Sequence, residues 1–360
     1  MKRIIIFSYD FPSNNGGISR LCGEIYNQCH ITNTPILVIT CCKGNHANDI
    51  IRIQGKRGLL ELKMFQYLRN NLRKGDIILT DTFHPAGFLA ELTGYPTIIL
   101  AHGAEFLPGN NFFRTKIFPK YRKYVLGKAT KVITNSHYTK DLVLSCNPKS
   151  NVVALPLAVD NYHFHPTKKK HNDGLLHLCT ISRLEKFKAQ DFIIRTIAHL
   201  PEKYKQKIQF AIGGKGVYKP ILEKMVKDFQ LEDIVFFHGF IPDDKLCDFY
   251  SENDVFILTT REEPNNKNVE GFGLVFLEAQ ACGTPTIGSR TGGISDAIEE
   301  GNGGWLIEQD NEKDLSSLLM KLIDNPSLIE DEAKKGMERI ANKCTWTEYF
   351  INLIDIINVR

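Results

Sequence analysis

Short apolar runs alternate with longer stretches of mixed polarity along the chain. The runs are rich in Ile, Val and Leu and lack a period-two alternation, which is typical of parallel strands buried on both faces. In the first half the predicted strands are Arg3–Ser8, Pro35–Thr40, Asp76–Thr80, Thr97–Ala101, Lys131–Thr134 and Val152–Leu155. In the second half they are Leu176–Ile181, Ile208–Ile212, Ile234–His238, Val255–Thr259 and Thr286–Gly288.

Helix-length amphipathic segments separate these strands. The predicted helices are Ser19–Cys29, Lys56–Leu72, Thr115–Leu126, Gln190–Leu200, Tyr218–Phe229, Asp243–Ser251, Gly273–Cys282, Leu315–Asn325 and Trp346–Asn358. We expect Pro119 to interrupt the third of them. Because strands and helices alternate on both sides of a polar break, the sequence predicts an α/β protein of two doubly wound domains.

The break is the polar and basic stretch Asn161–Gly174, whose composition suits a linker. It predicts a first domain over residues 1–165 and a second that begins at residue 166. Two such domains would face a central cleft formed by the carboxyl ends of both sheets, where ligands of doubly wound folds bind.

Composition narrows the class of protein. A chain of 360 residues favours two domains, and 42% hydrophobic with 24% charged residues indicates a globular protein. A net charge of +4 is too small to suggest nucleic acid as a partner. The nine cysteines form no CxxC pair, which argues against zinc and favours a reducing compartment. The apolar run Ile4–Phe7 is far shorter than a signal-peptide core, so we expect a cytoplasmic protein.

The segment from Phe106 to Lys140 contains no acidic residue. Its basic residues are Arg114, Lys116, Lys120, Arg122, Lys123, Lys128, Lys131 and Lys140, and aromatic and apolar side chains are interleaved among them. The segment is either a peripheral contact with an anionic membrane or a helix that packs on its own sheet with its lysines in water.

Two carboxylates flank the predicted start of one helix, Glu270 and, about two turns later, Glu278. Gly271 and Gly273 between them allow a ligand to approach the backbone closely, and a helix amino end attracts anions. The carboxylates suit the hydroxyl groups of a sugar or ribose. The alternative is an ordinary buried helix start.

Two cations, Arg183 and Lys188, follow a predicted strand at a strand-to-helix turn. Fixed cations at such a turn can stabilise a departing diphosphate, although a solvated basic turn is the alternative. The pair Gly16-Gly17 follows the first strand and permits close approach of a diphosphate, or it is a plain turn. Neither a GxGxxG fingerprint nor a Walker A loop is present there.

Taken together and in order, these motifs resemble the family-four retaining glycosyltransferases of the GT-B fold. The motifs are Gly16-Gly17, Ala101-His102-Gly103, Asn135-Ser136, Arg183 with Lys188, Gly213-Gly214-Lys215-Gly216, His238-Gly239, Asn253-Asp254-Val255, the Glu270-to-Glu278 segment and Thr291-Gly292-Gly293. The most specific is Glu270-to-Glu278 with its internal Gly-Phe-Gly and the trailing Ala-Gln-Ala-Cys-Gly-Thr-Pro. Ser182 and Ala189 stand where the family often has glycine, and Asp296 stands where it often has glutamate.

The resemblance implies a role for each matching residue. Glu278 would hold the donor ribose, Glu270 the transferred sugar, Arg183 and Lys188 the diphosphate, and His102 the C6 hydroxyl of the sugar, unless His102 is a structural residue ending a strand. The remaining donor-binding residues would be Gly16, Gly17, Gly214, Gly271, Phe272, Gly273 and Leu274. The last helix, within residues 345–360, would cross back to the N-terminal acceptor domain, and residues 166–344 would form the donor domain.

The resemblance also implies a reaction. A hexose would pass with retention from GDP-mannose or a UDP-hexose to a glycan or lipid-linked acceptor, in the biosynthesis of a bacterial surface polysaccharide such as lipopolysaccharide or capsule. The sequence shows no DxD-like acidic pair in a metal-binding loop, so we expect no metal and no cofactor. A non-catalytic nucleotide-sugar-binding subunit, a GT-B epimerase and a phosphorylase remain as alternatives.

Overall fold

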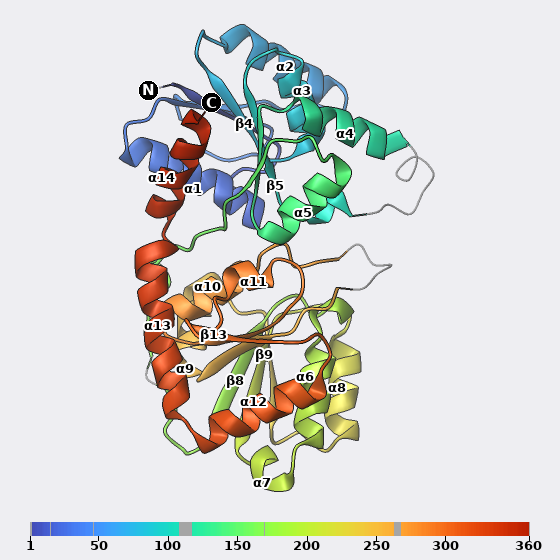
Figure 1. Ribbon diagram of the computed structural model, residues 1–360, viewed down its shortest axis with the longest axis vertical. Helices are drawn as coiled ribbons and strands as arrows, with labels where there is room; N and C mark the ends of the chain where they lie inside the picture. The colour runs from blue at the N-terminus through green and yellow to red at the C-terminus, as the bar shows by residue number, and fades with distance from the viewer. Residues whose placement is uncertain are drawn as a thin grey trace. The chain divides into compact units, whose positions relative to one another are not determined.

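The computed structural model of the chain describes residues 2–14, 16–45, 47–107, 117–168, 170–262 and 268–359. The chain divides into two compact units (Figure 1). Unit 1 comprises Met1–Leu157 and Trp346–Arg360, and unit 2 comprises Ala158–Thr345. Each unit is a parallel sheet with helices on both faces, so the predicted pair of doubly wound α/β domains is confirmed.

Unit 1 contains a seven-stranded parallel sheet in the order β3-β2-β1-β4-β5-β6-β7. Its strands are β1 (Ile4–Ser8), β2 (Ile36–Thr40), β3 (Ile50–Arg52), β4 (Ile77–Thr80), β5 (Thr97–Ala101), β6 (Lys131–Thr134) and β7 (Val152–Ala154). Every residue of β1, β4, β5 and β6 is buried, which explains their unbroken apolar runs. The edge strand β3 is too short to give such a run, and the sequence did not predict it.

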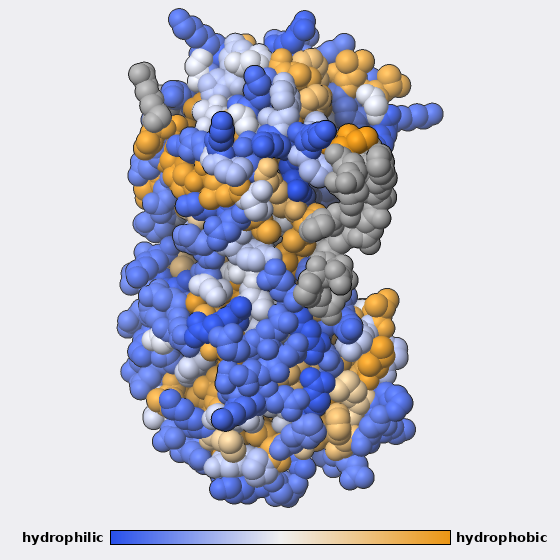
Figure 2. Space-filling view, turned by 45° about the vertical axis from the view of Figure 1, so that its right-hand side comes forward, coloured by the Kyte–Doolittle hydropathy of each residue, from blue (hydrophilic) through white to orange (hydrophobic). Residues whose placement is uncertain are grey.

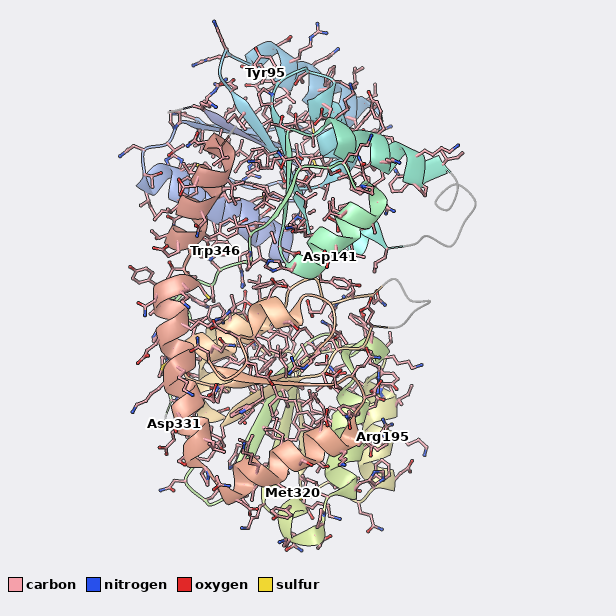
Figure 3. The ribbon with its side chains drawn as sticks, in the orientation of Figure 1. Tyr95, Asp141, Arg195, Met320, Asp331 and Trp346 are labelled. Atoms are coloured by element: carbon pink, nitrogen blue, oxygen red, sulfur yellow. The ribbon has the colours of Figure 1, made fainter. Side chains whose placement is uncertain are left out.

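The helices of unit 1 are α1 (Gly17–Ile31), α2 (Leu59–Asn71), α3 (Phe88–Glu91), α4 (Phe118–Lys128), α5 (His137–Cys146) and α14 (Trp346–Asn358). Helix α14, which begins at Trp346 (Figure 3), packs against α1. The ammonium of Lys131 donates to the carbonyl oxygen of Ile356 at 2.6 Å near its end. The C-terminal helix therefore belongs to unit 1, as expected for the fold.

Pro119 stands at the start of the helix that the structure describes after residue 116. Helix α4 starts at Phe118, and Pro119 occupies its first turn. A proline there loses no hydrogen bond, because the first N–H groups of a helix have no partner within it, and its fixed φ suits the helix start. The expected earlier part of this helix lies outside the described residues.

Unit 2 contains a six-stranded parallel sheet in the order β10-β9-β8-β11-β12-β13. The strands are β8 (Leu176–Ile181), β9 (Ile208–Gly213), β10 (Val235–Gly239), β11 (Val255–Leu258), β12 (Thr286–Ser289) and β13 (Gly304–Ile307). The helices are α6 (Gln190–His199), α7 (Glu202–Lys205), α8 (Lys219–Asp228), α9 (Leu246–Glu252), α10 (Leu274–Ala281), α11 (Ile294–Ala297), α12 (Glu312–Asp324) and α13 (Ser327–Lys343). Arg195 on α6 pairs with Glu312 on α12, and these two helices pack against each other (Figure 3).

The strand orders define one switch point in each sheet, between β1 and β4 in unit 1 and between β8 and β11 in unit 2. Ligands of doubly wound folds bind at the carboxyl ends of the strands beside such a point. The predicted linker residues 161–174 belong to unit 2, since the division lies between Leu157 and Ala158. Within the described residues, no helix has both the length and the apolar character that a membrane crossing requires.

Candidate active site

The turn after β8 carries the two predicted cations. Lys188 ends a short 3-10 turn, Lys186–Lys188, and Ala189 follows with a left-handed φ of 59°. An alanine in this conformation costs about 1–2 kcal/mol relative to the ordinary helical region. Glycine avoids that cost, which gives a physical reason for the glycine that the family often has at this position.

Lys188 meets Glu270, which lies 82 residues later in the chain. The Nζ of Lys188 is 2.6 Å from Oε2 of Glu270, and the side chains are only 12% and 18% exposed. Lys188 lies after β8 and Glu270 between β11 and α10, so the contact lies beside the switch point of unit 2. The structure therefore brings together one predicted diphosphate-binding cation and one predicted sugar-binding carboxylate.

Arg183 does not join this contact. Its guanidinium is 2.6 Å from Oε1 of Glu185, and its side chain is 71% exposed. An exposed ion pair of this kind contributes only about 0–1 kcal/mol. A doubly charged phosphate group can therefore compete with Glu185 for Arg183 at little cost.

The start of α10 depends on Gly273. Its φ of 93° is left-handed, and an added Cβ would lie 2.7 Å from the ring of Phe276. Gly273 caps the helix without offering a side-chain acceptor, and in the first turn the N–H of Phe276 donates to the carbonyl oxygen of Gly273 at 3.1 Å. Phe272 is buried at 2% exposure, which anchors this loop in unit 2. Gly271 beside it is half-buried.

The backbone of Glu270 is held by the turn after β12. The N–H of Gly293 donates to the carbonyl oxygen of Glu270 at 2.8 Å. A Cβ on Gly292, whose φ is 54°, would lie 2.4 Å from that same oxygen. The Gly-Gly pair in the Thr291-Gly292-Gly293 motif therefore lets the two loops pack in direct contact.

Glu278 lies on α10 and is nearly inaccessible, with 5% exposure. The hydroxyl of Tyr250, which lies on α9, donates to its Oε2 at 3.1 Å. Burial and the charge of Glu278 raise the pKa of Tyr250 well above its ordinary value, so the phenol stays protonated and remains a donor. Tyr250 was not predicted from the sequence, where it is one of many aromatic residues.

Gly214 follows β9 and packs against the chain that leaves β8. Its φ is 124°, and an added Cβ would lie 1.9 Å from the carbonyl oxygen of Ser182. Only glycine fits here. The structure therefore places Gly214 beside the segment that carries Arg183.

Arg261, immediately after β11, was missed by the sequence analysis and supports the turn of Lys188. Its guanidinium forms two hydrogen bonds with Asp191, at 2.7 and 2.9 Å, and its Nε donates to Asp310 at 2.8 Å. Its backbone N–H donates to the carbonyl oxygen of Phe187 at 2.6 Å. Burial lowers the pKa of Arg261, but the hydrogen bonds and charges of Asp191 and Asp310 raise it by more. The net pKa lies above its ordinary value, so the side chain stays a cation.

In unit 1 the predicted glycines lie at the start of α1. Gly16 is the cap, with extended backbone at φ 167°, and Gly17 begins the helix. An added Cβ on Gly16 would meet no atom within 4 Å. The cap offers no side-chain acceptor, so this helix start is open to an anion in the manner of a glycine-rich turn.

His102 follows β5, and its Nε2 lies 2.7 Å from the backbone carbonyl oxygen of Asp81. Because a carbonyl oxygen only accepts, Nε2 must carry the proton, and the lone pair of the neutral ring is then on Nδ1. A ring held in this way can accept a hydrogen bond from a substrate hydroxyl through Nδ1. His102 and the glycines of α1 lie in unit 1, whereas the other predicted site residues lie in unit 2.

Asp81, a third residue that the sequence analysis missed, ties three strand ends together. Its Oδ2 accepts from the hydroxyl of Ser8 and from the N–H groups of Tyr9 and Asp10, at 2.7–2.9 Å. Burial raises its pKa, although these hydrogen bonds oppose the rise. The loop that leads to Gly16 is thereby fixed to β4 and, through His102, to β5.

Two family descriptions match the two halves of the chain. Residues 162–341 match "Glycosyl transferases group 1", and residues 26–161 match "Glycosyltransferase Family 4". The chain belongs to glycosyltransferase family 4. Its resemblance to that family and its GT-B fold are thereby confirmed.

Relatives of this glycosyltransferase include mannosyl-transferring enzymes. It is 25% identical to a GDP-mannose-dependent alpha-(1-6)-phosphatidylinositol monomannoside mannosyltransferase of Mycobacterium tuberculosis, across 99% of this chain and 98% of that protein. The protein of the same name in Mycolicibacterium smegmatis is 26% identical across 65% of this chain and 64% of that protein. The mannosylfructose-phosphate synthase of Agrobacterium fabrum is 29% identical across 50% and 40%.

Solved structures share the fold at lower identity. Anabaena Alr3699/HepE, crystallised in complex with UDP, superimposes with a TM-score of 0.77 at 16% identity, and the match covers 99% of both chains. The sucrose-phosphate synthase of Thermosynechococcus elongatus superimposes with a TM-score of 0.75 at 17% identity, over 99% of this chain and 98% of that one.

Proposed function

We propose that this glycosyltransferase transfers a hexose from a nucleotide-diphosphate sugar, with unit 2 as the donor domain and unit 1 as the acceptor domain. The observation that carries the proposal is the 2.6 Å contact between Lys188 Nζ and Glu270 Oε2. A cation suited to the diphosphate and a carboxylate suited to sugar hydroxyls thereby meet at the switch point of a parallel sheet.

The four charged residues of the predicted site have these roles in the proposal. Lys188 would move from Glu270 to the diphosphate when the donor binds, which frees the Glu270 carboxylate to accept hydroxyls of the transferred sugar. Arg183 would leave Glu185 for the same diphosphate. Glu278 would accept the ribose hydroxyls with one oxygen while Tyr250 holds the other.

The proposed reaction is metal-independent and retaining. As the bond between the sugar C1 and the phosphate oxygen breaks, Arg183, Lys188 and the amino end of α10 would stabilise the charge that develops on the diphosphate. The acceptor oxygen would form its bond to C1 on the same face, and its proton would pass to the departing phosphate oxygen. This path needs no side-chain base, and the fixed positive charges supply what a divalent ion would supply elsewhere.

We propose GDP-mannose as the first donor to test and UDP-hexoses as the second. The Mycobacterium tuberculosis relative, which matches along 98% of its length, is GDP-mannose-dependent by name, which supports the first. A structural neighbour was crystallised with UDP-glucose, which supports including the second.

We further propose a glycan or lipid-linked acceptor at the cytoplasmic face of the cell membrane, in surface polysaccharide biosynthesis. The acid-free segment 106–140 supports a peripheral contact, since Ile117, which caps α4, and Tyr124 on that helix are 48% and 54% exposed beside exposed lysines. In Figure 2 hydrophobic side chains reach the surface among hydrophilic ones in unit 1. Lys131 is not available for this contact, because it is buried and binds α14.

Arg122 is also unavailable to a membrane, since its Nη1 donates to the carbonyl oxygen of Phe106 at 2.8 Å. Residues 108–116 of the segment lie outside the described residues. Flotation with vesicles containing anionic lipid, at low and then at high salt, tests the contact. Binding at low salt that is lost at high salt is expected, and no binding at low salt would remove the proposal.

The function is tested with a panel of nucleotide sugars. A true donor should raise the unfolding temperature, and wild-type protein should release its nucleoside diphosphate. Glu270→Ala should reduce that release about 10²-fold or more. Glu202→Ala, which removes a carboxylate paired with Lys205 on the exposed helix α7, is the matched control and should change nothing.

The alternatives give different outcomes in the same experiment. A non-catalytic subunit would bind a nucleotide sugar without releasing nucleoside diphosphate. An epimerase would change the sugar of the donor, and a phosphorylase would require added inorganic phosphate. If Glu270→Ala released nucleoside diphosphate as fast as wild type, the reaction would not take place at Glu270.

A further inference from the structure

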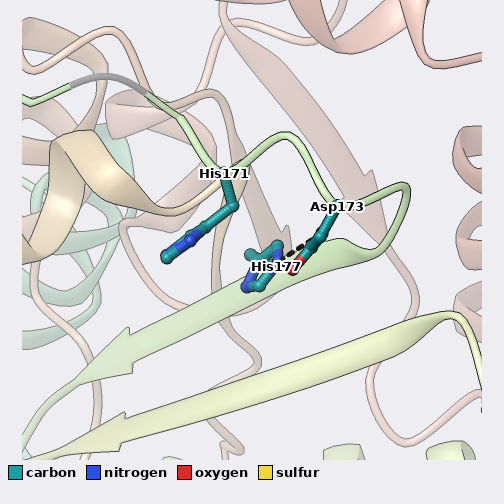
Figure 4. Close-up of side chains that lie close together, drawn as sticks. All are labelled: His171, Asp173 and His177. Carbon is teal, nitrogen blue, oxygen red and sulfur yellow. Dashed lines mark hydrogen bonds and ion pairs between the residues drawn. The ribbon is translucent and has the colours of Figure 1, made fainter.

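A cluster of three potential metal ligands lies at the amino end of β8. His171 and Asp173 project from the segment before the strand, and His177 is its second residue (Figure 4). The Nε2 of His177 is 3.0 Å from each carboxylate oxygen of Asp173. One ligand atom from each of the three residues lies within 4.8 Å of the others.

These distances suit one shared ion. His177 Nε2 and Asp173 Oδ1 are 3.0 Å apart. If an ion lay about 2.0–2.1 Å from both atoms, its two bonds to them would enclose an angle of about 95°. The rings of His171 and His177 are stacked, with centroids 4.1 Å apart and an angle of 22° between their planes. His171 must therefore turn before its lone pair points at the same ion, and its exposed position in the loop leaves room for that turn.

Two of the three ligands are already held in place. Asp173 accepts the N–H of Leu175 at 3.0 Å, and the backbone N–H of His177 donates to Asp254 at 2.9 Å. His177 is also fixed by the strand, because it pairs with Gln209 on β9. His171 and Asp173 are exposed, which gives an ion a path to the site, while His177 is buried. Ligands that are positioned before binding lose less entropy when the ion arrives.

The cluster differs from other histidine–carboxylate pairs in the chain. His199 and Glu312 approach to 3.0 Å, and His30 and Asp49 to 2.8 Å. Among the described residues, only the cluster before β8 brings three His, Cys, Asp or Glu side chains within reach of one ion. The second imidazole is therefore the feature that separates a metal site from an ordinary hydrogen-bonded pair.

We propose that His171, Asp173 and His177 bind one divalent transition-metal ion, with zinc the best fit and water completing its shell. Two imidazole nitrogens and one carboxylate oxygen are ligands that Zn²⁺ accepts, whereas Mg²⁺ and Ca²⁺ prefer oxygen alone. The ion joins the segment before β8 to the strand. It stabilises unit 2 because the unfolded chain does not hold these ligands together.

This ion takes no part in sugar transfer. The cluster lies at the amino end of β8, and Arg183 lies beyond its carboxyl end. A strand rises about 3.3 Å per residue, so the two ends of β8, Leu176 and Ile181, are about 16 Å apart. The proposal therefore stands independently of the proposed function. Chelator should lower the unfolding temperature of the protein and leave donor turnover at low temperature unchanged.

The test is calorimetric titration of ZnCl₂ into chelator-treated, reduced protein. One equivalent should bind, His171→Ala should weaken the affinity at least about tenfold, and His199→Ala should not change it. Asp173→Asn provides a second loss variant. His171 is exposed, so its replacement does not threaten the fold.

Cobalt substitution separates this site from the cysteines. Co²⁺ bound to nitrogen and oxygen gives weak visible bands, and Co²⁺ bound to thiolate adds intense near-ultraviolet absorption. The proposal predicts the first spectrum, lost in His171→Ala. Zinc affinity weaker than on the order of 100 µM, affinity unchanged in both loss variants, or a thiolate spectrum would overturn it.

Discussion

Replacing Arg261 by lysine should weaken the site while keeping its charge. The guanidinium spans two carboxylates, with Nη1 and Nη2 on Asp191 and Nε on Asp310. Nη1 also lies 3.2 Å from the carbonyl oxygen of Lys186. A lysine has one nitrogen on a flexible chain and cannot reproduce this fork.

The magnitude follows from burial. Arg261 and Asp191 are 9% and 10% exposed, so their pair is nearly desolvated. Hydrogen bonds to charged groups contribute about 1.5–3 kcal/mol, and Arg261→Lys forfeits part of several, so we expect a loss of about 2–3 kcal/mol in the free energy of unfolding. Arg261→Met leaves Asp191 unpaired and should cost about 3–5 kcal/mol. Domains are typically stable by about 5–15 kcal/mol, so the lysine variant should remain folded.

The functional effect should appear in the affinity for nucleoside diphosphate. The guanidinium of Arg261 donates to the carbonyl oxygen of Lys186, in the short turn that ends at Lys188, so Arg261→Lys loosens the turn that positions that cation. We expect about tenfold weaker binding of GDP or UDP, equivalent to about 1.4 kcal/mol, by calorimetric titration of the folded variant. Arg195→Lys, which alters the ion pair with Glu312 on the outer helices, is the matched control and should bind as wild type does.

A double-variant cycle isolates the mechanism. If Arg261 acts through Lys188, then Arg261→Lys should cost little additional affinity in a Lys188→Ala background. Unchanged affinity in Arg261→Lys, or the same loss of affinity in both backgrounds, would show that Arg261 does not act through Lys188.

Three further predictions concern pH, backbone space and the proposed ribose contact. Burial raises the pKa of Glu91 from 4.5 to about 7, so the stability that its protonated carboxyl contributes is lost as pH rises through 7. In thermal melts, Glu91→Gln should raise the unfolding temperature at pH 8 and leave it nearly unchanged at pH 4. Gly214→Ala should cost about 2–4 kcal/mol in urea unfolding because its Cβ meets a carbonyl oxygen at 1.9 Å, whereas Gly75→Ala, with φ of 94° and open space, should cost only about 1 kcal/mol. Tyr250→Phe removes the donor to Glu278 and should weaken binding of nucleoside diphosphate about three- to tenfold, and equal affinity would contradict this role.

The fold was predictable because its strands are buried on both faces. Mostly apolar segments such as Ile4–Ser8 and Leu176–Ile181 have no exposed face, and the sequence placed them within a residue of their observed bounds. Two of the four strands at the sheet edges, β3 and β13, gave weaker signals. Ile50–Arg52 has only three residues. Gly304–Ile307 begins with a glycine, because a Cβ at that position would lie 2.2 Å from the carbonyl oxygen of Thr286 on β12. The longest helix, Ser327–Lys343, was missed because its charged residues outnumber its buried ones.

The site was predictable where a motif places residues close together in sequence, as in the Glu270-to-Glu278 segment. Contacts between distant segments could not be predicted in the same way. The salt bridges of Arg261 join positions 70 and 49 residues away, and Asp81 binds a loop 71–73 residues earlier. Such partners depend on the strand order, which a single sequence leaves open. Lys131 shows a different kind of error. The sequence analysis counted it in the basic segment 106–140, but its side chain is buried and donates to a backbone carbonyl oxygen of α14.

Time-resolved NMR of the reaction can follow both the anomeric configuration of the product and the need for a metal ion. Wild-type protein is supplied with GDP-mannose or a UDP-hexose and an acceptor in excess EDTA, and the anomeric proton of the product is followed from the first turnover. We predict release of nucleoside diphosphate, a product with the anomeric configuration of the donor, and loss of both signals in Lys188→Ala. An inverted product would exclude a retaining transfer, and turnover that appears only after a divalent ion is added would exclude a metal-independent one.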